Sequence, residues 1–161
     1  MQVIPNFIKD KEIQQDLKNT LLGNQFDYYY QSSVAHTDDF MFTHGLWWPT
    51  DNGSPHISNY FIPIMMPILG KLSFTSLMRV KVNCYTKHKN FEKTGFHVDN
   101  PEPHMVGLYS VNTNNGYTLF EDGTKINSVE NQMLIFDGSK RHCSVAQTDT
   151  NLRVNININF K

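Results

Sequence analysis

A histidine and an aspartate stand two residues apart in the segment Gly95–Asp99, which reads Gly-Phe-His-Val-Asp. Residues i and i+2 of a strand point to the same side, so His97 and Asp99 can present an imidazole and a carboxylate together. A further histidine, His142, follows the strand-like stretch Gln132–Asp137 and a turn. If neighbouring strands bring His142 alongside, the three side chains form a two-histidine, one-carboxylate set. Such a set binds non-haem Fe(II) and leaves positions open for oxygen chemistry.

Each part of this set has a simpler interpretation when it is taken alone. His97 and Asp99 can be a hydrogen-bonded pair at a strand end, and His142 can be a surface loop residue. The other histidines lack ligand spacing, and we expect them to be surface or hydrogen-bonded residues: His36, His44, His56, His88 and His104.

The C-terminal segment Leu152–Phe160 alternates strictly between apolar and polar residues. Its polar positions are Arg153, Asn155, Asn157 and Asn159. Asparagine is depleted in strands, so three on one face require a reason. One reason is an amphipathic strand with a solvated polar side. The other is a polar barrel interior in which the planar guanidinium of Arg153 binds a carboxylate.

The order His97-x-Asp99, His142 and then Arg153 resembles the 2-oxoglutarate- and Fe(II)-dependent dioxygenases. The prolyl 4-hydroxylase-like branch is the more similar one, especially its small phage-encoded members. The resemblance extends from about Arg79 to Phe160, half of the chain. Its supporting segments are Arg79–Tyr85, Leu108–Phe120, Asn127–Asn131 and Ile135–Asp137.

The resemblance implies roles for seven residues. It makes His97, Asp99 and His142 the iron ligands, and Arg153 the residue that holds the distal carboxylate of 2-oxoglutarate. Further positions matching co-substrate-binding residues are Tyr85, Thr118 and, by likeness to the nucleic-acid demethylases, Asn83. Many of these hydroxylases have a lysine in place of Arg153, and a second glycine in place of Tyr117. Both departures loosen any inference about the substrate.

The same resemblance implies the reaction and its cofactors. Fe(II), 2-oxoglutarate and O2 would be required, with ascorbate as a candidate reductant. Hydroxylation of an unactivated C–H bond would be coupled to decarboxylation of 2-oxoglutarate to succinate and CO2. By likeness to the prolyl 4-hydroxylases, the expected substrate is a peptidyl residue such as proline.

The elements expected to position these residues are short strands in the second half of the chain. The predicted strands are Leu77–Thr86, Thr94–Val98, Met105–Val111, Tyr117–Glu121, Gln132–Asp137 and Leu152–Phe160. Turn signals such as Asn115-Gly116, Asp122-Gly123 and Asp137-Gly138 separate them. This pattern predicts an α+β, mainly β fold, a sandwich or jelly roll with helices outside one sheet. The resemblance specifies a double-stranded β-helix, cupin-like in form.

The first half of the chain has a helical and irregular texture. Asp10 can cap a helix that runs to about Leu22, with Gly23 as its stop. The aromatic stretch Tyr28–Pro49 is expected to be irregular, and a helical segment opening at Ser54-Pro55 to be broken into a pair by prolines. We expect a single domain over residues 1–161, helical and irregular over 1–76, with the jelly-roll core over 77–161.

Composition excludes several classes of protein. The 161 residues include 14 Lys and Arg against 15 Asp and Glu, which disfavours nucleic acid and anionic lipid as partners. No stretch approaches the length of a membrane-spanning helix, and the N-terminus lacks the pattern of a signal peptide. Two cysteines without a paired spacing favour a reduced, cytoplasmic protein.

Three classes of function stay open at this point. The first is hydroxylation of a peptide or protein, and the second is the same chemistry on a nucleobase or free small molecule. The third is a jelly-roll binding module without turnover. The aromatic segment 40–49 and the polar loop 87–93 are candidate substrate contacts, with core packing and a solvated hairpin as the alternatives.

Overall fold

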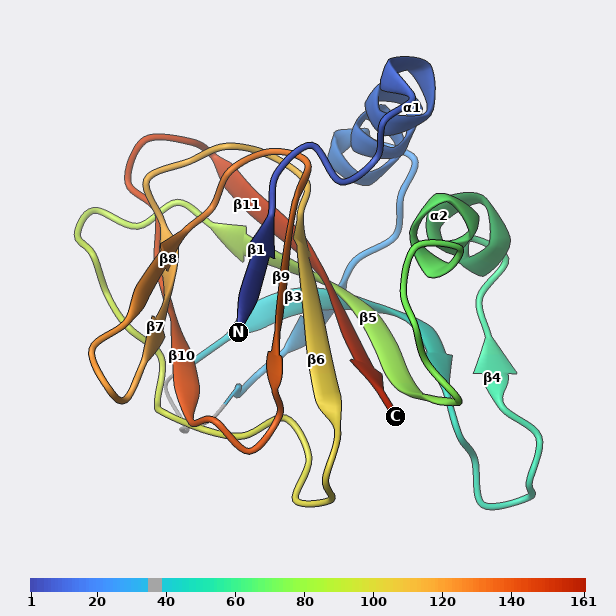
Figure 1. Cartoon of the computed structure of the whole chain (residues 1–161). Helices are drawn as coiled ribbons and strands as arrows, with labels where there is room; N and C mark the ends of the chain where they lie inside the picture. The colour runs from blue at the N-terminus through green and yellow to red at the C-terminus, as the bar shows by residue number, and fades with distance from the viewer. Residues whose placement is uncertain (35–38) are drawn as a thin grey trace.

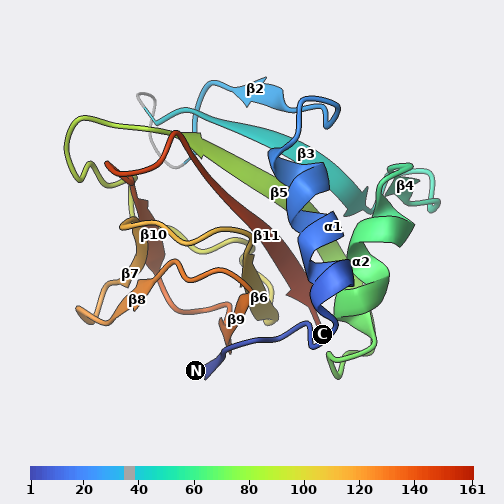
Figure 2. The same ribbon diagram turned by 90° about the horizontal axis from the view of Figure 1, so that it is seen from above.

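The computed structural model describes residues 1–34 and 39–161, so His36 lies outside the described residues. Two antiparallel sheets face each other, and both helices cover the outer side of the larger sheet (Figure 1 and Figure 2). The larger sheet has the order β1-β9-β6-β11-β5-β3-β2, with β4 paired to β3, and the smaller has the order β10-β7-β8. This is the α+β jelly-roll architecture that the strand pattern predicts.

The strands of the larger sheet are β1 (Gln2–Ile4), β2 (Tyr29–Gln31), β3 (Met41–Trp48), β4 (His56–Ile57), β5 (Leu77–Thr86), β6 (Met105–Ser110), β9 (Gln132–Asp137) and β11 (Leu152–Phe160). The smaller sheet consists of β7 (Tyr117–Phe120), β8 (Lys125–Asn127) and β10 (His142–Val145). The predicted bounds of β5, β9 and β11 are confirmed at both ends.

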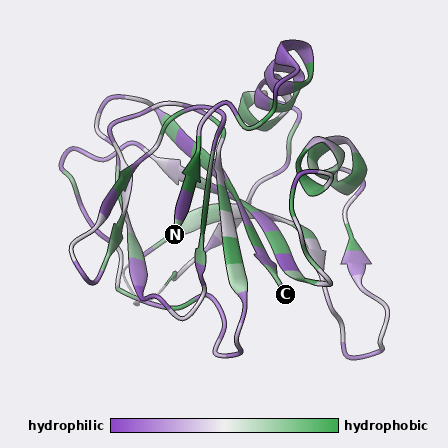
Figure 3. Ribbon diagram, viewed as in Figure 1, coloured by the Kyte–Doolittle hydropathy of each residue, from purple (hydrophilic) through white to green (hydrophobic). Residues whose placement is uncertain are grey.

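Both faces of β11 are buried, each against a different layer. Its apolar residues, including Ile156 and Ile158, join Val80 and Val82 of β5 in a core beneath the helices. Its polar residues face the space between the sheets, where Arg153 is 2% exposed and Asn159 is 1% exposed. The solvated amphipathic strand is therefore excluded, and the polar barrel interior is confirmed. Figure 3 shows the alternation of hydrophobic and hydrophilic residues along the strands.

Helix α1 (Lys11–Leu22) has the predicted cap and stop. The Asp10 carboxylate accepts hydrogen bonds from the backbone N–H groups of Glu12 and Ile13, and Gly23 is the C-cap. The helix buries Leu17 and Leu21 on the large sheet. It thereby closes the core on the side away from the polar interior.

The aromatic stretch Tyr28–Pro49 was expected to be irregular, and within its described residues that prediction is wrong for 29–31 and 41–48. It forms the edge strand β2 and the long strand β3, which pairs with β5. Aromatic and threonine side chains suit a half-buried pleated surface, so the composition favours a strand here. The polar His44 and the flexible Gly45 interrupt the pattern by which the strand would have been detected.

Two further element predictions are wrong. The broken helix pair is one helix, α2 (Phe61–Leu69), preceded by β4. Pro63 lies in its first turn, where a missing N–H costs nothing, and the helix ends two residues after Pro67. The segment Thr94–Val98 is not a strand, because its one bridge is the isolated pairing of His97 with His142 of β10. Among the described residues, neither helix is long and apolar enough to cross a membrane.

Candidate metal centre

His97, Asp99 and His142 converge at the open end of the space between the sheets. One ligand atom from each lies within 4.8 Å of the others. A single antiparallel bridge brings the histidines together, since the backbone N–H of each donates to the carbonyl of the other at 3.0 Å. Their ring centroids are 5.0 Å apart. The three side chains that the spacing singled out therefore form one cluster.

Both imidazoles are oriented by their own backbone. The Nδ1 atom of His97 lies 3.0 Å from the carbonyl oxygen of Gly95, and that of His142 lies 3.0 Å from the carbonyl oxygen of Lys140. A carbonyl only accepts, so each Nδ1 carries the proton and each Nε2 keeps a free lone pair. Burial lowers the pKa of His142, against the opposing attraction of Asp99, and so favours the neutral ring that a metal requires.

The Asp99 carboxylate is held by amides of β11. Asn157 and Asn159 donate to its Oδ2 atom at 2.9 and 3.1 Å, while Arg79 donates to Oδ1 at 3.2 Å. Burial alone would raise the pKa of Asp99, but His142, Asn157, Arg79 and Lys81 together lower it to about 2. The asparagine ladder thus has a structural reason, because two of its amides fix an ionised carboxylate.

A narrow cavity of about 40 Å³ leads inward from the cluster. Its lining includes every residue that the sequence proposed for co-substrate binding: Asn83, Tyr85, Thr118 and Arg153. The strand register explains this, since β11 pairs Arg153 with Tyr85 and Asn155 with Asn83. All these side chains, and the three of the cluster, line one continuous polar interior.

Arg153 lies at the inner end of this interior. Its guanidinium donates to the hydroxyls of Ser128 and Ser144 and to the carbonyl of Val145. The carbon Cζ also lies 5.3 Å from the centre of the Tyr85 ring. Its remaining nitrogen, Nη2, makes no hydrogen bond within the described residues, and so is available to an anion in the cavity.

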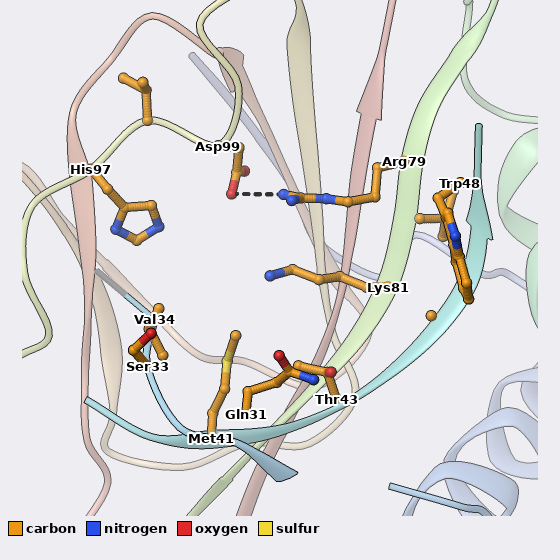
Figure 4. A pocket seen from close by; sticks show the side chains of 13 residues that line it. Gln31, Ser33, Val34, Met41, Thr43, Trp48, Arg79, Lys81, His97 and Asp99 are labelled. Carbon is orange, nitrogen blue, oxygen red and sulfur yellow. Dashed lines mark hydrogen bonds and ion pairs between the residues drawn. The ribbon is translucent and has the colours of Figure 1, made fainter. Parts of the chain in front are cut away.

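A wider pocket of about 360 Å³ opens on the other side of the cluster (Figure 4). His97 and Asp99 border it, and Arg79 and Lys81 extend from β5 toward it, while Met41 and Trp48 provide apolar surface. The sequence analysis did not assign Arg79, Lys81, Asn157 or Asn159 to the site, and it included Met41 only within the candidate segment 40–49. The alternation of β5 was the available signal, since positions 79 and 81 share a face with Asn83 and Tyr85.

Most of the other residues considered in the sequence analysis lie away from the cluster and its two cavities. Phe40 and the loop 87–93 border a separate pocket, where His88 pairs with Glu92 at 3.0 Å. Of the aromatic segment, Trp48 lines the wider pocket, whereas Phe42 and Trp47 pack against the core. His44 bonds to Asp27 and Ser58, and His104 bonds to Glu102.

No protein-family model and no curated protein matches the sequence. Solved structures do match the fold. A prolyl hydroxylase from Trichoplax adhaerens, in complex with a hypoxia inducible factor peptide fragment, aligns with a TM-score of 0.65 at 15% identity, over 99% of this chain and 82% of that one. An oxidoreductase of the 2OG-Fe(II) oxygenase family from Burkholderia pseudomallei gives 0.63 at 10% identity, over 91% and 76%.

A viral collagen prolyl hydroxylase from Paramecium Bursaria Chlorella virus-1, in its 2OG complex, gives a TM-score of 0.60 at 12% identity, over 98% of this chain and 93% of that one. Identities this low show the fold alone. The chain has the jelly-roll fold of the 2-oxoglutarate- and Fe(II)-dependent oxygenases.

Proposed function

We propose that this chain is a non-haem Fe(II)- and 2-oxoglutarate-dependent dioxygenase that hydroxylates a peptidyl residue such as proline. The observation that carries the proposal is the cluster of His97, Asp99 and His142 at the junction of two cavities. A two-histidine, one-carboxylate set occupies one side of a metal and leaves the other side for co-substrate and O2. The narrow cavity would then hold the co-substrate and the wider pocket the substrate.

The residues present fit Fe(II). Both histidines have Nδ1 bound to a carbonyl and Nε2 free, and the carboxylate is ionised and fixed by amides. His97, Asp99 and His142 would hold the ion, while Asn157 and Asn159 would orient the carboxylate. The protein thereby supplies a rigid ligand set before any metal binds.

The residues of the narrow cavity fit a dicarboxylate. Arg153 would hold the distal carboxylate of 2-oxoglutarate through its free Nη2, and Tyr85 and Thr118 would line the bound molecule, with Asn83 beside them. When bound, Fe(II) and 2-oxoglutarate use O2 to hydroxylate a C–H bond, with release of succinate and CO2 and with ascorbate as a reductant for the iron. The cavity walls, the half-buried Leu108 and the buried Cys143 among them, would keep water from this side of the metal.

A peptide substrate is supported by the kind of protein that shares the fold. The similar structures include prolyl hydroxylases, one of them in complex with a peptide fragment. In this chain the wider pocket has both apolar and polar walls and is several times larger than the inner cavity. The free, buried thiols of Cys84 and Cys143 support a reducing, cytoplasmic location.

The test is an anaerobic titration of the protein with Fe(II) and then with 2-oxoglutarate, followed by visible absorption. We expect a metal-to-ligand charge-transfer band in the wild type and none in His97→Ala. His104→Ala is the control, because His104 is as buried as His142 but its ring bonds, within the described residues, only to the Glu102 carbonyl, and it should keep the band. A folded, metal-loaded wild type without the band would refute the dioxygenase and leave the binding module.

A further inference from the structure

Two cationic side chains, Lys81 and Arg79, lie on the polar face of β5, next to the residues proposed to bind the co-substrate. Side chains two apart share a face of a strand, so Tyr85, Asn83, Lys81 and Arg79 follow one another from the inside of the barrel toward its mouth. Lys81 borders both the narrow cavity and the wider pocket. Figure 4 shows its amine directed into the open space in front of Asp99.

Within the part of the chain that the structure describes, Lys81 has no anionic partner of its own. Among the described residues its amine makes no hydrogen bond and no ion pair. Its side chain is half-buried, and burial, with the repulsion of Arg79, lowers its pKa to about 8 against the attraction of Asp99. An ammonium in such surroundings is costly unless an anion pairs with it.

Asp99 is not available to neutralise Lys81. Both of its oxygens already accept hydrogen bonds, Oδ1 from Arg79 and Oδ2 from Asn157 and Asn159. In the proposed function the same carboxylate also binds the metal. The charge of Lys81 therefore remains for a molecule that enters the pocket.

Arg79 adds a second cation beside Lys81. One of its terminal nitrogens donates to Asp99, and its side chain keeps 35% of its surface exposed. Its other terminal nitrogen makes no hydrogen bond within the described residues. Both cations thus border the wider pocket.

An apolar wall lies beside these cations. Gly45 pairs with Lys81 across β3 and β5, and a Cβ there would stand 2.2 Å from Cζ3 of Trp48. The indole therefore lies against the bare Gly45 backbone, where it lines the pocket together with Met41. The pocket thus offers a cationic side and an apolar side to the same occupant.

From these contacts we propose that the substrate is an acidic peptide, whose carboxylate binds Lys81 and Arg79 while the residue to be hydroxylated lies against the apolar wall. This inference rests on the proposed function, since it takes the metal cluster as the reacting centre. It adds the charge of the substrate, which the resemblance leaves open. A carboxylate paired with an ammonium forms charge-assisted hydrogen bonds, which are stronger than neutral ones.

The test uses pairs of acetylated peptides centred on proline, with glutamate or glutamine at each flanking position in turn. Binding is measured anaerobically on the Fe(II)- and 2-oxoglutarate-loaded protein by the change in the charge-transfer band and by calorimetry. At one position or more, we expect the glutamate peptide to bind wild type at least about 10-fold more tightly than its glutamine partner. Peptides with a free or an amidated C-terminus show whether a terminal carboxylate can replace the side chain.

Two variants identify the source of this preference. Lys81→Met keeps the length and apolar stem of the side chain, and should bring the glutamate-to-glutamine ratio close to one. Lys11→Met removes one charge from an exposed position on α1 and should leave the ratio unchanged. Equal binding of both members of every pair, or an unchanged ratio in Lys81→Met, would overturn the inference. The band that forms before any peptide is added tests the proposed function separately.

Discussion

Replacing Asn157 with alanine tests whether β11 orients the Asp99 carboxylate that we propose as a metal ligand. The change removes the 2.9 Å hydrogen bond to Oδ2 of Asp99 and leaves the 3.1 Å bond from Asn159. Loss of one such supporting partner typically weakens metal binding 10–100-fold, which corresponds to about 1.4–2.7 kcal/mol. Little else is lost at this position, since the Oδ1 atom of Asn157 has no hydrogen-bond partner among the described residues.

Asn155→Ala is the matched control for this prediction. Asn155 and Asn157 lie on the same face of the same strand, and each is 4% exposed. Asn155 accepts a hydrogen bond from Asn83 and makes none to Asp99. Its replacement should therefore change the Fe(II) dissociation constant by less than about threefold, at a comparable cost in stability.

The assay is anaerobic calorimetry with Fe(II), with the melting temperature of each variant recorded first. Equal Fe(II) affinity in Asn157→Ala and wild type, or equal weakening in both variants, would refute the orientation of Asp99 by this amide. The double change at Asn157 and Asn159 should cost more than the sum of the single changes, because the second removal leaves Oδ2 without an amide donor.

Three further predictions concern the co-substrate, the metal and Lys81. Arg153→Met should raise the dissociation constant of 2-oxoglutarate about 100-fold, because the guanidinium that would bind its distal carboxylate is lost. The affinity for Fe(II) should stay within about threefold of wild type, and anaerobic titration with each ligand measures both constants. Adding a chelator to protein loaded with Fe(II) at about 100 times its dissociation constant should remove about 2.7 kcal/mol and lower the melting temperature by about 5–10 °C. The pKa of Lys81 is about 8 in the folded protein, against 10.5 for an ordinary lysine, so between these pH values only the unfolded state keeps the proton. The free energy of unfolding of wild type, relative to Lys81→Met, should therefore rise from pH 8 to pH 10.5. Urea unfolding of chelator-treated protein at both pH values measures this, and no rise would mean that the amine is fully solvated.

Sequence patterns were most informative about the candidate site where one strand carries the information. The alternation of Leu152–Phe160 placed Arg153 and the asparagines on one face, and the structure confirms a buried polar face. The His97-x-Asp99 spacing was also local. That His142 joins them depends on a bridge between residues 45 positions apart, which only the chemistry of the set suggested.

The first half of the chain was harder to predict because its strands are defined by their partners. β3 lies beside β5, more than thirty residues later in the chain, and its Gly45 is explained only by the indole of Trp48 packed over it. A glycine in an isolated segment indicates a turn or a break. In β3 the glycine instead makes room for an indole within a strand, so the local sequence pattern wrongly predicted an irregular segment.

The charges in front of the metal cluster show a different limit. Alternation along β5 is enough to place Arg79 and Lys81 on the face of Tyr85 and Asn83. The alternation cannot show which anion pairs with each cation, because the nearest carboxylate could neutralise either Arg79 or Lys81. Arg79 and two asparagine amides already bind Asp99, and this network, drawn from three separate segments, is what leaves the Lys81 amine free within the described residues. The proposed preference for an acidic substrate therefore depends on tertiary hydrogen bonding. Arg79→Met should weaken that preference although Lys81 is retained, because Arg79 itself would bind the substrate carboxylate and because Asp99 would be freed to pair with Lys81.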